Sequence, residues 1–301
     1  MNRHSWRVGL AMAAVTALIL AGCTSGANTT VQLQHVHGLG FTADGAQLFV
    51  PAHDGFRVYA NNGTWQEPNI PKHDYMGYVA TDDGFYSSGH PGSGSSLPNP
   101  LGLVKSKDNG KTLTTLGFEG EIDFHTMGVG YKNHAVYVFN PAPTAKLPGG
   151  LHYTLDDGKT WKKSSAQGVS GEPIQIAVHP TQANVVAVAS EGGLFLSTDY
   201  GNAFERVGGL SPVTAASFTP TGETLLFGLQ KLYAYDLTSK QVREIPTPAV
   251  GAKDAIGYVA VSPAQGKTIA FATFGKDIHI TTDGGQTWKQ IAQQGKGVPA
   301  K

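Results

Sequence analysis

The sequence is poor in cysteine and arginine and carries no excess of charge of either sign. Cys23 is its one cysteine, so the rest of the chain can form neither an internal disulfide nor a thiolate metal site. The 22 basic and 22 acidic side chains cancel, the isoelectric point is about 7.2, and lysine and arginine are not clustered. Nucleic acid and anionic membrane surfaces both select concentrated positive charge, so neither is expected as a partner.

Long hydrophobic runs are also missing, apart from one at the N-terminus. An uncharged apolar run from Val8 to Leu20 follows Arg3 and Arg7. It is shorter than the roughly 20 residues that span a bilayer, and a basic start before a short apolar run is typical of a secretion signal. The run ends in Leu20-Ala21-Gly22-Cys23, which resembles the lipobox of bacterial lipoproteins.

This resemblance divides the chain into three parts. Residues 1–23 are expected to be a lipoprotein signal peptide, with Cys23 as the lipidated first residue of the mature protein. Residues 24–34 are expected to be a tether, and residues 35–301 a single domain. The protein is then extracytoplasmic, and the lipid on Cys23 anchors it to a bacterial membrane.

One eight-residue pattern recurs four times and predicts the architecture. Aspartate in a short polar turn accepts backbone N–H bonds, glycine supplies positive φ, and the final apolar residue is expected to pack against the next blade. The copies are Ser106 to Leu113, Thr154 to Trp161, Ser197 to Phe204 and Thr281 to Trp288. They resemble Asp boxes (BNR repeats), found in the propellers of sialidases, sortilin-type receptors and photosystem II assembly factors. Their aspartates, Asp108, Asp156, Asp199 and Asp283, are interpreted as structural.

Between these turns, short apolar strands alternate with Gly, Pro, Asn and Asp, and no amphipathic helix is evident. Two weaker turns, near Asn62 and Asp236, complete a series of six. Six similar segments open the repeats, beginning at His37, Asp74, His125, Glu172, Pro212 and Asp254. The prediction is an all-β fold, a six-bladed β-propeller of four-stranded antiparallel blades.

In such a blade the aspartate turns join the third and fourth strands, so the inner strands start on the opposite face. That face collects a ring of His37, Asp74, His125, Glu172, Ser211 and Asp254. The same face gains His53-Asp54, the segment from His90 to Pro100, and Glu191, with His35 and His73 beside the ring. Imidazole and carboxylate together favour a transition metal such as copper or zinc, with His37, His125 and Asp74 as candidate ligands. The alternative is a set of polar groups that hydrogen-bond water in the channel.

Propellers with Asp boxes are often labelled as glycosyl hydrolases, so the resemblance also implies catalysis. Sialidase activity is not expected, because the three arginines after the signal, Arg57, Arg206 and Arg243, do not lie at strand starts. A general glycoside hydrolase needs only two carboxylates across a cleft. Asp74, Glu172 and Asp254 are the candidates for that role, although the ring offers histidines as well.

The sequence therefore predicts a monomeric, noncatalytic module that binds a ligand, metal or protein through its His/carboxylate face. The candidate binding residues are His35, His37, His53, His73, Asp74, His90, His125, Glu172 and Asp254. A protein or a carbohydrate is a possible ligand. Two alternatives stay open, a glycoside hydrolase-like enzyme and a purely structural interaction scaffold.

Overall fold

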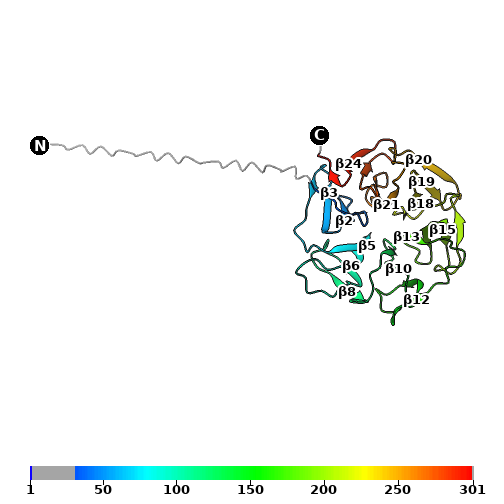
Figure 1. Ribbon diagram of the computed structural model, residues 1–301. Coiled ribbons are helices and arrows are strands. Elements are labelled where there is room, and N and C mark those ends of the chain that lie inside the picture. Colours follow the sequence, from blue (N-terminus) through cyan, green and yellow to red (C-terminus); the bar gives the residue numbers. More distant parts are fainter. Residues whose placement is uncertain (2–30, 300–301) are drawn as a thin grey trace.

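The computed structural model describes Met1 and residues 31–299, and it is all-β. Six antiparallel sheets form a closed ring around a central channel (Figure 1). The described residues include no helix able to cross a membrane. The predicted signal peptide, Cys23 and the first part of the tether lie outside the described residues.

The sheets are numbered here as blades 1 to 6 in chain order. From inner to outer strand they are β1 (Gly40–Phe41), β2 (Gln47–Ala52), β3 (Gly55–Ala60) and β4 (Trp65–Gln66); β5 (Asp74–Thr81), β6 (Gly84–His90), β7 (Leu103–Ser106) and β8 (Thr114–Gly117); β9 (Thr126–Val129), β10 (Val136–Asn140), β11 (Gly150–Thr154) and β12 (Lys162–Lys163); β13 (Pro173–Val178), β14 (Val186–Ser190), β15 (Gly193–Ser197) and β16 (Glu205–Val207); β17 (Ala215–Phe218), β18 (Thr224–Gly228), β19 (Leu232–Asp236) and β20 (Val242–Ile245); and β21 (Ile256–Val261), β22 (Ile269–Thr273), β23 (Ile278–Thr281), β24 (Lys289–Gln293) and β25 (Lys296–Gly297).

This arrangement confirms the six-bladed, four-stranded prediction, with one addition at the point where the ring closes. Residues before blade 1 pair with the short fifth strand of blade 6: the amide of Leu33 donates to the Gly295 carbonyl (2.6 Å), and that of Gly297 donates to the Val31 carbonyl (2.9 Å). Val31 and Leu33 are buried. The propeller therefore extends to Val31, within the predicted tether. Local sequence does not indicate this boundary, because the pairing joins segments far apart in the chain.

One apolar cluster lies between each pair of neighbouring blades. Alternating strand residues supply these clusters, as expected for sheets whose two faces are both covered. The aromatic that ends a turn packs against the preceding blade, contrary to the expectation of the next one. Trp161 of blade 3 contacts Phe118 and Phe124, and the indole of Trp288 in blade 6 donates to the Pro246 carbonyl (2.6 Å). In blades 3 and 6 the tryptophan that ends the turn therefore lies on the face toward the preceding blade.

The four aspartate turns join the third and fourth strands of blades 2, 3, 4 and 6, as predicted. In blade 6, Asp283 Oδ1 accepts from the Thr281 hydroxyl (2.6 Å) and the Thr287 amide (3.0 Å), and Oδ2 accepts from the Thr287 hydroxyl (2.6 Å). The next two residues, Gly284 and Gly285, both have positive φ. These bonds hold the pKa of Asp283 far below its ordinary value, led by the Thr281 and Thr287 hydroxyls.

Candidate functional site

The starts of the inner strands and the second-to-third strand hairpins lie on the face opposite the aspartate turns. His35 and His37 precede β1 two residues apart, so an extended backbone places both on one side. Their rings stack with centroids 6.1 Å apart. The His37 amide donates to the Pro51 carbonyl (3.0 Å), which fixes this segment against β2.

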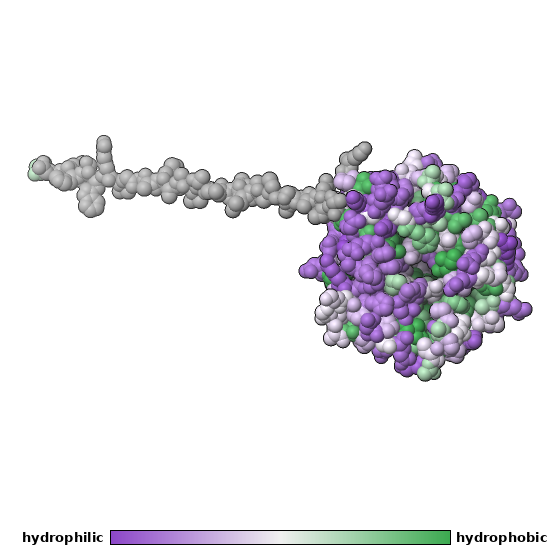
Figure 2. Space-filling view, viewed as in Figure 1, coloured by the Kyte–Doolittle hydropathy of each residue, from purple (hydrophilic) through white to green (hydrophobic). Residues whose placement is uncertain are grey.

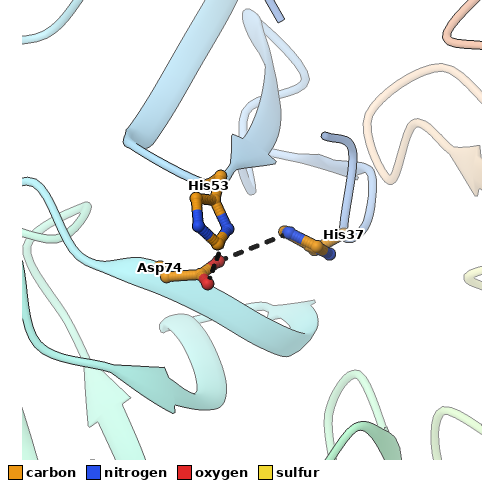
Figure 3. A group of neighbouring side chains, drawn as sticks. All are labelled: His37, His53 and Asp74. Atoms are coloured by element: carbon orange, nitrogen blue, oxygen red, sulfur yellow. Dashed lines mark ion pairs between the residues drawn. The ribbon is translucent and has the colours of Figure 1, made fainter. Parts of the chain in front are cut away.

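His53 and Asp74 complete a three-residue group with His37 (Figure 3). His53 lies in the hairpin between β2 and β3, and Asp74 is the first residue of β5 in the next blade. His53 Nδ1 is 2.9 Å from Asp74 Oδ2, and His37 Nε2 is 3.3 Å from Asp74 Oδ1. One nitrogen or oxygen from each side chain lies within 4.8 Å of the others.

The interior side of this group is buried, whereas its outer side is exposed. The side chains of His37 and Asp74 are 16% and 10% exposed, and that of His53 is 60% exposed. His37 Nε2 and Asp74 Oδ1 are buried, and apart from their 3.3 Å contact with each other neither has a polar partner among the described residues. Burial lowers the pKa of His37, an effect that Asp74 opposes and His35, His53 and His125 reinforce. The site thus brings two imidazoles and one carboxylate together with their ligand atoms facing one another.

A second group lies one blade further along, around Asp123 in the connection between blades 2 and 3. Asp123 Oδ2 is 3.1 Å from His90 Nε2 and 2.5 Å from His125 Nε2. His90 ends β6 and is the cross-strand partner of Asp74. The hydrogen bond with Asp123 raises the pKa of His125, although burial opposes it.

The predicted metal ligands His37, Asp74 and His125 are therefore divided between two groups. His53 joins His37 and Asp74, whereas His125 pairs with Asp123. Asp123 was missed by the sequence analysis, because it precedes the aligned strand start. The signal that could have found it is the Asp-Phe-His order, whose first and third residues fall on one side of an extended chain.

The other predicted binding residues have different surroundings. The buried His73 accepts the Gly92 amide at Nδ1 (3.0 Å), and His35 is exposed. Glu172 is exposed beside blade 4. Asp254 Oδ1 accepts the amides of Ala255 (2.8 Å) and Gly275 (2.9 Å), which stabilises its own loop. The predicted ring residues of blades 1 to 3 thus contact other histidines and carboxylates, whereas those of blades 4 to 6 do not.

The channel surface changes character between these halves. On the face shown in Figure 2, hydrophilic surface gathers over blades 1 and 2, and more apolar surface lies across the central hollow. Tyr258 and Phe274 of blade 6 line the channel, and Phe274 is 53% exposed. Gln175 of blade 4 links blades 5 and 6 on this side of the channel. Its side chain accepts the Ala216 amide (2.7 Å) and donates to the Gly257 carbonyl (3.2 Å).

A further group of Asp82, Asp83 and His134 lies in the first-to-second strand turns on the opposite face. Asp83 Oδ2 already pairs with Lys105 Nζ (3.4 Å) and Lys107 Nζ (3.0 Å). Those two ammonium groups supply the positive charge that the carboxylates need. This group is therefore a closed ion-pair network, unlike the histidine groups at the channel mouth.

No family model matches the chain. It is 25% identical over 221 residues to a probable oligoxyloglucan-reducing end-specific xyloglucanase of Neosartorya fischeri, a match that covers 64% of this chain and 24% of that protein.

Solved propellers match over most of the chain. The GH74 xyloglucanase of Xanthomonas campestris is 17% identical with a TM-score of 0.53, and the match covers 88% of this chain and 46% of that one. The GH74 enzyme of Niastella koreensis is 16% identical with a TM-score of 0.56, covering 87% and 46%. YCF48 bound to D1 peptide is 16% identical with a TM-score of 0.50, covering 87% and 83%. These structures share the propeller fold, and the chain spans less than half the length of the two GH74 proteins.

Proposed function

We propose that this protein is an extracytoplasmic propeller that binds a transition-metal ion, such as Cu²⁺ or Zn²⁺, between blades 1 and 2. The observation that carries the proposal is the convergence of His37, His53 and Asp74, with ligand atoms within 4.8 Å of one another. Two imidazoles and a carboxylate match the ligand preferences of both ions.

The buried atoms support a cation in particular. His37 Nε2 and Asp74 Oδ1 are 3.3 Å apart without forming a hydrogen bond, they have no other partner among the described residues, and leaving buried polar groups without hydrogen bonds is costly. A cation between them would satisfy both. The open side at His53 provides an entry path, and a water or His35 could complete four-coordination.

Metal titration of the purified protein tests this function. His37→Ala and His53→Ala should each abolish high-affinity binding of Cu²⁺ or Zn²⁺, measured by competition with a chromophoric chelator. His134→Ala, on the opposite face, is the matched imidazole control and should bind as wild type does. Equal affinity in all four proteins would contradict the proposal.

We also propose that Cys23 carries the lipid and that the propeller is held at a bacterial membrane through the tether. The Leu20-Ala21-Gly22-Cys23 tetrapeptide supports this location. Cys23→Ala should move the protein from the membrane fraction to the soluble fraction or leave it unprocessed. Unchanged processing and membrane association would contradict lipidation.

A second candidate is a glycoside hydrolase-like activity, which the match to the Neosartorya fischeri xyloglucanase favours over the metal proposal. Glu172 is solvent-exposed, and Asp254 lies beside the exposed Phe274, a surface on which a sugar ring could stack. Release of reducing ends from xyloglucan oligosaccharides tests this candidate. A hydrolase should lose turnover in Glu172→Gln or Asp254→Asn and keep it after chelation, whereas a metal-binding module should show no turnover.

A further inference from the structure

The central channel shares His37 with the proposed metal site. Its volume is about 190 Å³, below the roughly 300–1,000 Å³ of sites for drug-sized ligands. His37 of blade 1 and His125 of blade 3 line the channel together with residues of the other four blades, and no Asp, Glu, Lys or Arg is among the described residues that do so. A small ligand in the channel therefore meets side chains that are charged near neutral pH only at its histidines.

Blade 6 gives the channel an aromatic wall next to His37. Tyr258 and Phe274 both line the channel, with their ring centroids 6.4 Å apart and their planes at 72°. Blades 6 and 1 are neighbours because the ring closes between them, and Tyr258 packs against the same apolar cluster as Val36. The imidazole of His37 and the two aromatic rings therefore line neighbouring sectors of one channel.

The backbone holds Phe274 in its exposed position. Its amide donates to the Ala255 carbonyl (3.0 Å), and the next amide, that of Gly275, donates to Asp254 Oδ1 (2.9 Å). Gly257 leaves room for the ring, since a Cβ there would come within 2.8 Å of a Phe274 ring carbon. The hairpin between β22 and β23 thus presents the ring at the channel. Aromatic rings beside a few polar groups in a concave site are typical of small-molecule binding.

The metal site determines the charge of a ligand that reaches it. A Zn²⁺ or Cu²⁺ ion carries two positive charges, and Asp74 is the single carboxylate among its proposed ligands. An anionic ligand would balance the excess charge, whereas an ammonium group would be repelled. Carboxylate oxygen is also among the ligands that zinc accepts. The exposed side of the group, at His53, leaves a direction from which such a ligand can approach.

We infer that the channel mouth binds a small monocarboxylate with an apolar body. Its carboxylate coordinates the ion at His37, His53 and Asp74, and its body packs against Tyr258 and Phe274. The inference rests on the proposed function, because it names the ligand class of that same site. The channel volume limits the body to about the size of a benzene ring.

Benzoate is the probe, because it combines a carboxylate with a single ring. Isothermal titration calorimetry of the zinc-loaded protein in detergent should show saturable binding of benzoate. Benzyl alcohol and benzylamine keep the ring without the negative charge, so they should bind at least about tenfold more weakly. Protein stripped of zinc with a chelator should lose most of its affinity for benzoate. Equal binding of the three probes would overturn the carboxylate class.

Phe274→Ala tests the aromatic wall without removing a metal ligand. It should weaken benzoate binding by roughly fivefold and leave zinc affinity unchanged. Leu155→Ala is the matched control, because Leu155 is an exposed apolar residue in the blade 3 aspartate turn, on the opposite face. Both positions are exposed, so folding is not at risk. Equal benzoate affinity in Phe274→Ala and wild type would overturn the role of the wall.

The outcomes separate the inference from the proposed function. Zinc that binds without any benzoate binding overturns the inference and leaves the proposed function. A protein that binds no zinc overturns the proposed function, and the coordinated carboxylate with it. Benzoate that binds the zinc-free and zinc-loaded proteins equally overturns coordination by the ion.

Discussion

The carboxylates of this propeller fall into two groups that differ in how completely they are satisfied. In the aspartate turns, such as that of Asp156, both oxygens accept bonds from the turn itself, at 2.7 to 2.9 Å. At the channel mouth, Asp74 and Asp123 each leave a buried oxygen without a partner among the described residues. The repeated carboxylates therefore hold the blades, and the unrepeated ones are available to a ligand.

The largest expected effect is on metal binding at the group of His37, His53 and Asp74. Asp74→Asn removes the charge of a proposed metal ligand that faces two imidazoles. Metal affinity should therefore fall by more than the roughly 10- to 100-fold that a change outside the ligand shell causes. Asp283→Asn, in a turn, is the matched control and should bind metal as wild type does. A chelator competition measures the metal affinity of both variants. Equal losses of affinity would contradict the distinction between the two groups of carboxylates.

A substitution in an aspartate turn should lower thermal stability and leave metal binding unchanged. Asp283→Ala removes the acceptor for the Thr281 and Thr287 hydroxyls and the Thr287 amide, so the melting temperature should fall by several degrees. Metal affinity should not change. A melting temperature like that of wild type in differential scanning calorimetry would contradict a structural role for this turn.

The turns should also make stability sensitive to acid. Hydrogen bonds, first from the Thr160 amide and then from its hydroxyl, lower the pKa of Asp156 from 3.8 to about 2. Because the folded pKa is depressed, the stabilisation is present above pH 3.8 and is lost as the pH falls through about 2. Urea unfolding between those pH values should show a smaller pH slope for Asp156→Asn than for wild type. An unchanged slope would argue against this linkage.

The smallest expected effect is a gain in the free energy of unfolding. The blade 4 turn has Ala203 where the other three aspartate turns have threonine. At this position Asp199 therefore accepts only the Ala203 amide (3.0 Å) and no hydroxyl. Ala203→Thr should add the missing hydroxyl bond and stabilise the protein by about 0.5 kcal/mol. The urea midpoint should rise at constant slope, and a lower midpoint would contradict the comparison between turns.

The fold was predictable because its signals are local. Each aspartate turn fixes two strands, and strand alternation then fixes the blade. The ring closure by Val31 and Leu33 was not predictable in the same way, because those residues pair with Gly295 and Gly297 at the far end of the chain. No local pattern encodes that register.

The site was only partly predictable for a similar reason. His37 and Asp74 start their strands and were found by alignment, but which imidazole faces which carboxylate depends on the twist between blades. His53 was expected on the same face without a partner, and Asp123 lay outside the alignment. The convergence of the groups was therefore visible only in three dimensions.

Anomalous diffraction from crystals soaked in Cu²⁺ or Zn²⁺ tests the central claim most directly. The account predicts a peak within bonding distance of His37 Nε2, a His53 ring nitrogen and an Asp74 oxygen, roughly 2.0–2.2 Å from each. That peak should be missing in His37→Ala crystals. A wild-type map with no peak between these three side chains would contradict the claim.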